Sequence, residues 1–168
     1  MDFSVGKHEN KAVIEVMIKD PSYIVWIMNQ SNKSKFHEKV TLFAAHRIEV
    51  FNKIPFQRKC NFGGCENTID CCVLLKTESH WLCDTCLQSM RDEFGRYSVV
   101  NTYMGAVNYI TCLFDSPKAR GENSMLLVRE LARAKGLPKR ATLFDISKFF
   151  SYVEPVKPKL YEKFFADE

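Results

Sequence analysis

The sequence contains no long hydrophobic run. Its longest apolar stretch, from Tyr23 to Met28, lies between Pro21 and Asn29 and is far shorter than the roughly 20 residues that a membrane-spanning helix needs. The sequence therefore predicts no membrane helix. The first residues also lack a basic segment followed by an apolar block, which is the pattern of a secretion signal. We accordingly expect a cytoplasmic protein.

Motifs of several enzyme classes are missing as well. We find no glycine-rich phosphate loop, no nucleophile elbow and no convincing pair of carboxylates. Zinc deaminases combine His-x-Glu with Pro-Cys-x-x-Cys, and no His-x-Glu occurs in this chain. We therefore predict a protein that is not an enzyme, with a hydrolase as a remote alternative.

Internal repeats and low-complexity segments are absent too. The chain has 168 residues, of which 46% are hydrophobic, so its length suits one domain and its composition suffices to bury a core. We expect one compact unit with three parts: a helical segment at 1–55, a metal-binding module at 56–96 and a helical C-terminal region at 97–168.

The cysteines are the most informative residues that are present. The chain has seven, an odd number, and six of them lie between Cys60 and Cys86. Four residues separate Cys60 from Cys65, two separate Cys83 from Cys86, and 17 residues separate the two pairs. In a reducing compartment, such clustered pairs favour a metal site over disulfides. The spacing predicts one Zn²⁺ per chain, held by these four thiolates in a tetrahedral shell.

The other three cysteines lack a partner at ligand spacing. Cys71, Cys72 and Cys112 are therefore interpreted as buried thiols, which pack as small hydrophobic side chains. His80 precedes Cys83 by three residues, but four thiolates already complete the shell, so we expect it at the surface or beside the ligands. A closed shell leaves no position for a catalytic water. The zinc is thus expected to be structural, with a binding free energy on the order of 10 kcal/mol.

Periodicity and turn residues predict an α+β fold, mostly helical, with a small N-terminal hairpin and a treble-clef-like zinc module. Pro117 is expected to end one helix, with Asn123 or Ser124 capping the next, and Gly95 is expected to stop another. The expected elements are a hairpin at 2–11, strands at 72–76 and 80–82, and helices at 12–19, 21–29, 37–54, 86–94, 100–114, 123–135 and 142–152.

The net charge of +4 is modest, but charge is unevenly distributed. Residues 61–117 carry 3 basic and 7 acidic residues, whereas residues 118–140 carry 7 basic and 2 acidic ones. Arg129 and Arg133 share one face of the helix expected there, opposite Leu127 and Leu131. This face predicts a phosphate-binding stripe, although a merely solvated face is the alternative. Further basic residues flank the helix: Arg120, Lys135, Lys139 and Arg140.

The N-terminus carries a second pattern, with Gly6-Lys7-His8 in the expected hairpin and Asp20-Pro21-Ser22-Tyr23 followed by Trp26. This segment resembles the C-terminal accessory domain of exodeoxyribonuclease X-like proteins. The resemblance covers about 30 residues and implies a module that accompanies DNA-processing enzymes in bacterial and phage proteins. It does not imply nuclease activity, because the Asp-x-Glu pair that precedes the accessory domain in that family is missing.

The roles of these N-terminal residues stay open between two interpretations. Tyr23 and Trp26 lie three residues apart on one helix face, so we expect them to be core aromatics. Lys7, His8 and Lys11, near the expected hairpin tip, are candidate DNA contacts or solvated side chains. Together these features predict a non-catalytic, zinc-stabilised accessory protein that binds DNA and is encoded by a phage. The alternative is a phage factor that modulates a host polymerase or nuclease through its acidic zinc module.

Overall fold

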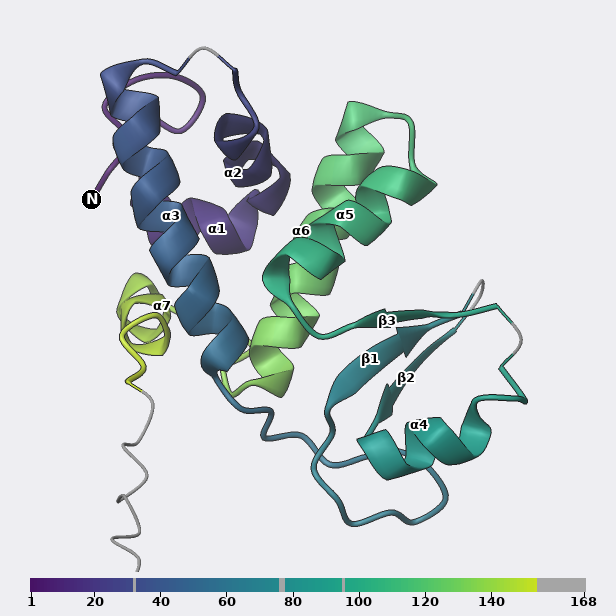
Figure 1. Ribbon diagram of the computed structural model, residues 1–168. Helices are drawn as coiled ribbons and strands as arrows, with labels where there is room; N and C mark the ends of the chain where they lie inside the picture. The colour runs from purple at the N-terminus through teal and green to yellow at the C-terminus, as the bar shows by residue number, and fades with distance from the viewer. Residues whose placement is uncertain (32, 76–77, 95, 154–168) are drawn as a thin grey trace, which may run out of the picture.

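The computed structural model describes residues 1–31, 33–75, 78–94 and 96–153. Lys76, Gly95 and the tail after Val153, on which some expectations fell, lie outside these residues. Figure 1 shows the described chain, an α+β fold with these elements in order: α1 (Val13–Lys19), α2 (Pro21–Met28), α3 (Lys35–Lys53), β1 (Cys71–Leu74), β2 (Ser79–Leu82), α4 (Asp84–Met90), β3 (Ser98–Val100), α5 (Tyr103–Leu113), α6 (Pro117–Ala134) and α7 (Leu143–Phe149).

The first three helices begin and end close to the predicted positions. Asp20 separates α1 from α2, because its side chain accepts a hydrogen bond from the backbone N–H of Tyr23 and Pro21 takes the first helical position. Ser34 caps α3 in the same way by accepting from the N–H of His37. The N-terminal hairpin is reduced to one isolated antiparallel bridge, between Asp2 and Ala12.

The prediction that Pro117 ends a helix, with a cap at Asn123 or Ser124, is wrong. Ser116 is the N-cap of α6, and Pro117 occupies its first turn. Proline fits there because a first-turn N–H has no partner within the helix. Ser124 is instead buried inside α6. The helix is therefore 18 residues long and begins at Pro117 instead of at Asn123 or Ser124.

The sheet has three antiparallel strands in the order β2-β1-β3. Cys71 pairs with Leu82 and Cys72 with Trp81 across β1 and β2, and Cys72 also pairs with Val100 of β3. The prediction that placed Val100 in a helix missed β3, because its β-branched pair Val99-Val100 directly precedes the apolar pattern of α5. The helix α4 ends at Met90, earlier than the expected Phe94.

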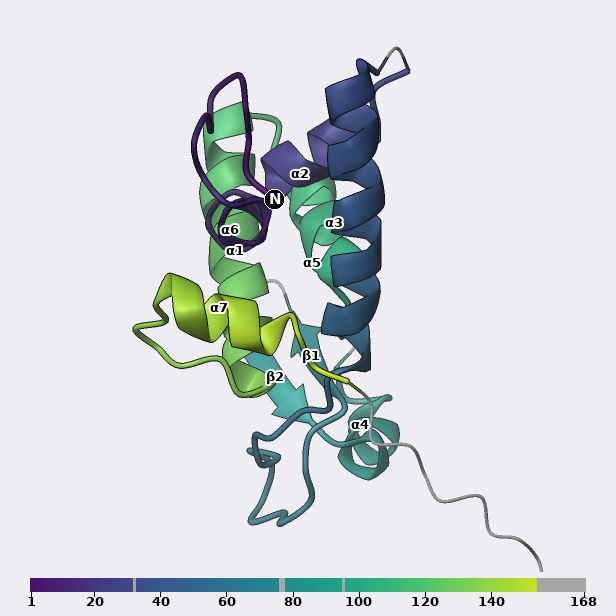
Figure 2. The same ribbon diagram turned by 90° about the vertical axis from the view of Figure 1, so that its left-hand side faces the viewer.

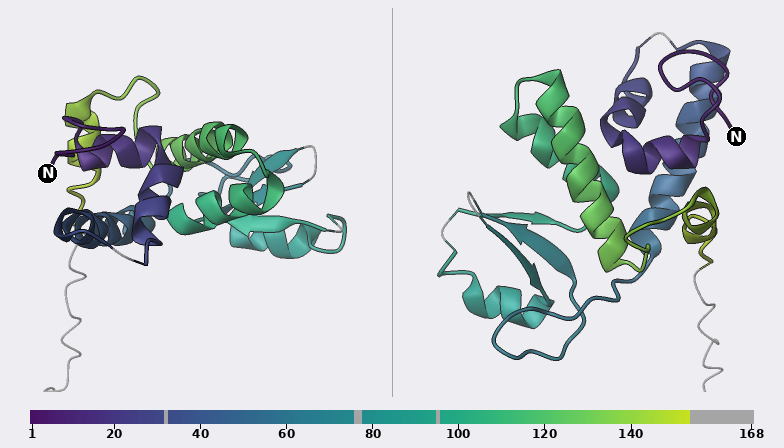
Figure 3. Two further views of the ribbon diagram at one scale, coloured as in Figure 1. Left: turned by 90° about the horizontal axis from the view of Figure 1, so that it is seen from above. Right: turned by 180° about the vertical axis from the view of Figure 1, so that it is seen from behind.

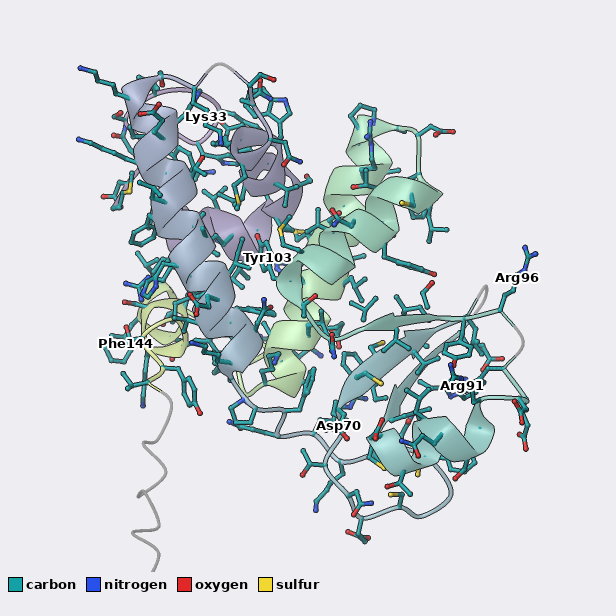
Figure 4. The ribbon with its side chains drawn as sticks, in the orientation of Figure 1. Lys33, Asp70, Arg91, Arg96, Tyr103 and Phe144 are labelled. Atoms are coloured by element: carbon teal, nitrogen blue, oxygen red, sulfur yellow. The ribbon has the colours of Figure 1, made fainter. Side chains whose placement is uncertain are left out.

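The core joins α1, α3 and α5 around Tyr103, which is labelled between the helices in Figure 4. The Tyr103 hydroxyl donates to the carbonyl of Met17 at 2.8 Å, and its ring meets Phe51 edge-on at 5.5 Å. Figure 2 shows α7 below α1 and near the lower end of α3, where Arg47 Nη1 donates to the carbonyl of Phe150 at 2.7 Å.

The helix α6 occupies the middle of the molecule. From behind, it runs between the N-terminal helices on one side and the sheet with α4 on the other (Figure 3). It packs against α5, α2 and α1. None of the described helices is both long and apolar enough to cross a membrane.

Candidate functional site

Four cysteine side chains meet below the sheet, at the end of the molecule that carries α4. Cys60, Cys65, Cys83 and Cys86 each offer a sulfur, and all four sulfur atoms lie within 4.8 Å of one another. The Sγ atoms of Cys65 and Cys83 are 3.8 Å apart. That separation is too long for a disulfide and equals the edge of about 3.8 Å expected when four thiolates surround one ion at about 2.3 Å. The cluster fits a tetrahedral metal ion.

The first pair is held by the loop between Cys60 and Cys65. Gly63 and Gly64 have φ angles of 52° and 80°, in the left-handed region that suits glycine. The N–H of Cys65 donates to the carbonyl of Phe62 at 2.8 Å, and the N–H of Cys60 donates to Asn67 O at 2.9 Å. These bonds turn both sulfur atoms toward the same point.

The second pair lies at the start of α4. Cys83 is the residue before the helix, and Cys86 follows in its first turn. The backbone N–H of Cys86 lowers the pKa of the Cys83 thiol to about 7, with a smaller contribution from the side-chain amide of Asn67. Hydrogen bonding to the Cys83 sulfur raises the pKa of Cys86. The backbone thus stabilises the thiolate at Cys83, which is the form that binds metal.

Asp70 supports this start of α4 from outside. It is labelled beside the helix in Figure 4, and its Oδ2 accepts from the backbone N–H of Asp84 at 2.8 Å. The N–H of Asp70 in turn donates to the carbonyl of Leu82 at 2.9 Å. The hairpin β1–β2 and α4 are thereby fixed to one another, so the second cysteine pair is positioned by both.

The remaining cysteines lie outside the cluster. Burial raises the pKa of Cys71 to about 11 and that of Cys72 to about 12, so both thiols stay protonated at neutral pH. The expectation that Cys112 is buried is wrong, because it is exposed on α5. His80 is partly exposed and stacks on Phe94, and its Nε2 lies 3.2 Å from Glu78.

A second feature is a basic hollow beside the C-terminal half of α6. It has a volume of about 140 Å³. Arg129 and Arg133 line it from α6, and Lys19 lines it from the end of α1. Lys139 and Arg140 follow from the loop after α6, so five basic side chains border one small space. Sequence reasoning missed Lys19, because only the packing of α1 on α6 brings it there.

An adjoining hollow of about 290 Å³ continues along α6 toward its N-terminus. Lys19 borders both hollows, and Lys7 and Lys118 border the second one together with Asp20 and Glu122. The α6 residues involved follow helical spacing, so they share one face. We call both hollows together the basic groove, defined by the cationic residues Lys7, Lys19, Lys118, Arg129, Arg133, Lys139 and Arg140.

Partners within the groove differ between the two arginines of α6. Arg133 forms an ion pair with Glu130 and donates to the carbonyl of Lys139 at 3.4 Å. Arg129 has no hydrogen-bond or ion-pair partner among the described residues. Its guanidinium therefore retains its full set of donors for an anion.

Several residues proposed from the sequence do not line this groove. Arg120 donates to the carbonyl of Asp115 from another face of α6, and Lys11 is exposed elsewhere. Lys135, expected beside the stripe, is only 3% exposed and donates to the carbonyl of Ile54 at 2.5 Å. Burial lowers its pKa to about 8.

His8 is also unsuited to contact DNA. It is 8% exposed, and its ring packs edge-on against Tyr23 at 4.8 Å. Its Nε2 donates to Asp20 at 2.9 Å, and Lys7 donates to the same carboxylate oxygen at 2.6 Å. The Gly-Lys-His and Asp-Pro motifs therefore bind each other across the N-terminal segment.

Trp26 is not a core residue, contrary to the expectation from helix spacing. It is 51% exposed, and its ring stacks on the partly buried Tyr23 at 5.5 Å with an angle of 23°. A shared helix face is not necessarily a buried one. Here the Trp26 ring covers part of Tyr23 and itself faces the solvent. The pair forms an exposed aromatic surface.

The comparisons with known proteins concern this N-terminal segment. The family model of the exodeoxyribonuclease X-like C-terminal domain matches residues 3–32, which confirms the resemblance found in the sequence. No curated protein and no solved structure gave a match. The matched range contains the hydrogen-bonded motifs and the exposed aromatic pair, so these features belong to the part of the chain that is similar to the exodeoxyribonuclease X-like C-terminal domain.

Proposed function

We propose that this chain is a non-catalytic DNA-binding accessory protein that acts in DNA metabolism or transcription and is stabilised by one zinc ion. The observation that carries the DNA-binding part is the convergence of five basic side chains from α1, α6 and the following loop on one hollow. These residues come from segments that are far apart in the sequence. A solvated face of one helix would gather only residues of that helix. Such a cluster suits the phosphates of a DNA backbone.

Zinc is the metal that suits the cysteine cluster best. Four thiolates are soft ligands, and zinc accepts them in tetrahedral geometry. All four positions are filled by protein, which supports a structural ion rather than a Lewis acid for catalysis. The ion would join the loop after Cys60 to the start of α4, which the bond from the Asn67 side-chain amide to the Cys83 sulfur also connects.

The charge distribution supports DNA binding on the groove rather than on the zinc module. Glu66, Asp70 and Asp84 are exposed around the cysteine cluster. Four thiolates around a divalent ion add further negative charge, so this end of the molecule repels phosphates. The N-terminal match supports the same role, because its family name refers to an exodeoxyribonuclease. Origin from a phage stays a prediction.

The exposed acidic residues also define the second candidate. A basic surface of a host polymerase or nuclease could bind Glu66, Asp70 and Asp84, and the zinc module would then be the docking surface. Under this hypothesis, changes in the groove leave partner binding intact, whereas changes at these acidic positions weaken it.

The test is a DNA-binding titration at several salt concentrations. Replacing Arg129 and Arg133 by Glu should weaken binding and reduce the slope of log K against log salt by about 2, because two phosphate contacts are lost. A matched control, Lys39→Glu with Arg120→Glu, changes the charge equally outside the groove and should preserve the slope. A folded Arg129→Glu/Arg133→Glu variant with wild-type affinity and slope would exclude this groove as the DNA site.

A further inference from the structure

The exposed Trp26 and the partly buried Tyr23 lie next to the basic groove. Ser22 borders the groove from α2, and Trp26 follows it by four residues, so the two share one helix face. Lys7, which also borders the groove, holds its ammonium 5.9 Å from the centre of the Tyr23 ring. The aromatic pair thus continues the line of the groove along α2.

The pair has the properties of a platform for flat ligands. The two rings are nearly parallel, and Tyr23 supports the Trp26 ring from the protein side. A supported ring keeps a fixed orientation, and the indole is 51% exposed. Large aromatic side chains that serve only packing are normally buried, as Trp81 is at 6% exposure.

Two lysine side chains contact this platform or the helix that carries it. The ammonium group of Lys7 lies near the Tyr23 ring. Lys33, which is labelled in Figure 4, donates to the carbonyl of Met28 at the C-terminal end of α2. Aromatic rings interleaved with basic side chains are the usual means of binding single strands, because bases stack on the rings while ammonium groups contact phosphates. A duplex keeps its bases stacked on one another and cannot use such a platform.

We propose that the DNA bound by this protein is single-stranded, with its backbone in the basic groove and a base stacked on Trp26. This inference rests on the proposed function and specifies its substrate. Phosphate contacts in the groove supply most of the affinity, and the stacked base supplies the preference for a single strand over a duplex.

The experiment compares binding of a short oligothymidylate with binding of a hairpin duplex of similar length. Wild-type protein should prefer the oligothymidylate, and its tryptophan fluorescence should be quenched on binding. The chain has two tryptophans. The other one, Trp81, is buried under the Arg58 guanidinium at 4.9 Å, so the quenching reports on Trp26.

Trp26→Ala should weaken oligothymidylate binding about 10-fold with an unchanged salt slope, and should leave duplex binding as it is. Trp26→Phe should retain part of the affinity without the quenching. Leu42→Ala, which removes an exposed apolar side chain from α3, is the matched control and should bind as wild type.

The outcomes separate this inference from the function on which it rests. Wild-type protein that binds neither DNA form would overturn the proposed function. Wild-type protein that binds DNA, with Trp26→Ala unchanged toward oligothymidylate, would overturn only the stacking proposal. Tighter binding of oligouridylate than of oligothymidylate would overturn the assignment to DNA.

Discussion

Asp20 is the residue that organises the N-terminal segment. Its Oδ2 accepts from Lys7 and His8, and its Oδ1 accepts from the hydroxyl of Ser22 at 3.1 Å and from the N–H of Tyr23 at 3.3 Å. Burial works most strongly against ionisation of this carboxyl group, but the hydrogen bonds from Lys7, His8 and Ser22 together outweigh it and lower its pKa. The aromatic pair and the groove residue Lys7 are therefore positioned by one carboxylate.

Replacing Asp20 by Asn should reduce the free energy of unfolding by about 1–2 kcal/mol near pH 7, since charge-assisted hydrogen bonds to two cations are lost. Because the folded-state pKa of Asp20 lies below its ordinary value of 3.8, its contribution is present above that value and is lost as the pH falls through the lowered pKa. The difference between wild type and variant should accordingly shrink below pH 3.8.

Urea denaturation followed by circular dichroism measures this difference. A metal ion held by the cysteine cluster would be lost from both proteins in acid, so comparing them at each pH cancels that effect. Asp92→Asn, at an exposed position after α4, is the control and should behave as wild type. A difference between wild type and Asp20→Asn that is equally large at neutral and acidic pH would contradict the role assigned to the carboxylate.

At the scale of elements, the two ends of α6 depend on glycine in opposite ways. Gly121 lies inside the helix, and a Cβ there would be 3.7 Å from the Ser22 hydroxyl, an ordinary contact. Gly136 follows the helix with a φ of 102°, which side chains rarely adopt. The first glycine is dispensable for the backbone, whereas the second turns the chain toward Lys139 and Arg140.

We expect Gly121→Ala to stabilise the protein by about 0.5–1 kcal/mol, because alanine restricts the unfolded chain and favours the helix. Gly136→Ala should destabilise it by about 1–2 kcal/mol through its strained φ. Thermal denaturation of both variants checks the pair. Shifts of the same sign would contradict this account of how α6 ends.

Local sequence signals predicted most helices but misjudged some of their boundaries. The Asp20-Pro21 pair marked the border of α1 and α2 because a cap and a first-turn proline act locally. Ser116-Pro117 is the same kind of signal, but because it follows an apolar helix the pattern predicts the end of that helix there as well as the start of the next. The strand β3 was missed because its three residues pair only with β1, a contact that periodicity does not reveal.

The candidate sites differ in how far the sequence could predict them. The cysteine cluster was predicted completely, since each pair is local and zinc geometry requires four ligands. Five of the residues that define the basic groove were expected to bind nucleic acid: Arg129, Arg133, Lys139 and Arg140, which lie close in sequence, and Lys7 in the N-terminal segment. Lys19 joins it through helix packing, and the burial of Lys135 follows from its contact with Phe56, whose ring centre lies 4.1 Å from its ammonium. Neither the position of Lys19 nor the burial of Lys135 could be predicted from the sequence of α6 alone.

On the scale of the whole molecule, the two candidate sites lie in different parts of the fold. The metal cluster belongs to the sheet and α4, and the groove belongs to α1 and α6 (Figures 1 and 3). The Arg58 guanidinium over Trp81 and the bond from Gln57 N–H to the carbonyl of Ala134 connect them. We therefore expect loss of the metal ion to unfold the sheet and α4 first. The groove, and with it DNA binding, should be affected less than the sheet and α4.

Native mass spectrometry of the purified protein tests the zinc centre, on which the account of the sheet module depends. We predict one zinc ion per folded chain. Cys83→Ser should lose the ion because the shell is opened, while Cys112→Ser should keep it because that thiol is exposed outside the cluster. Wild-type protein that is folded without zinc, or a Cys83→Ser variant that retains zinc and stability as Cys112→Ser does, would contradict the account.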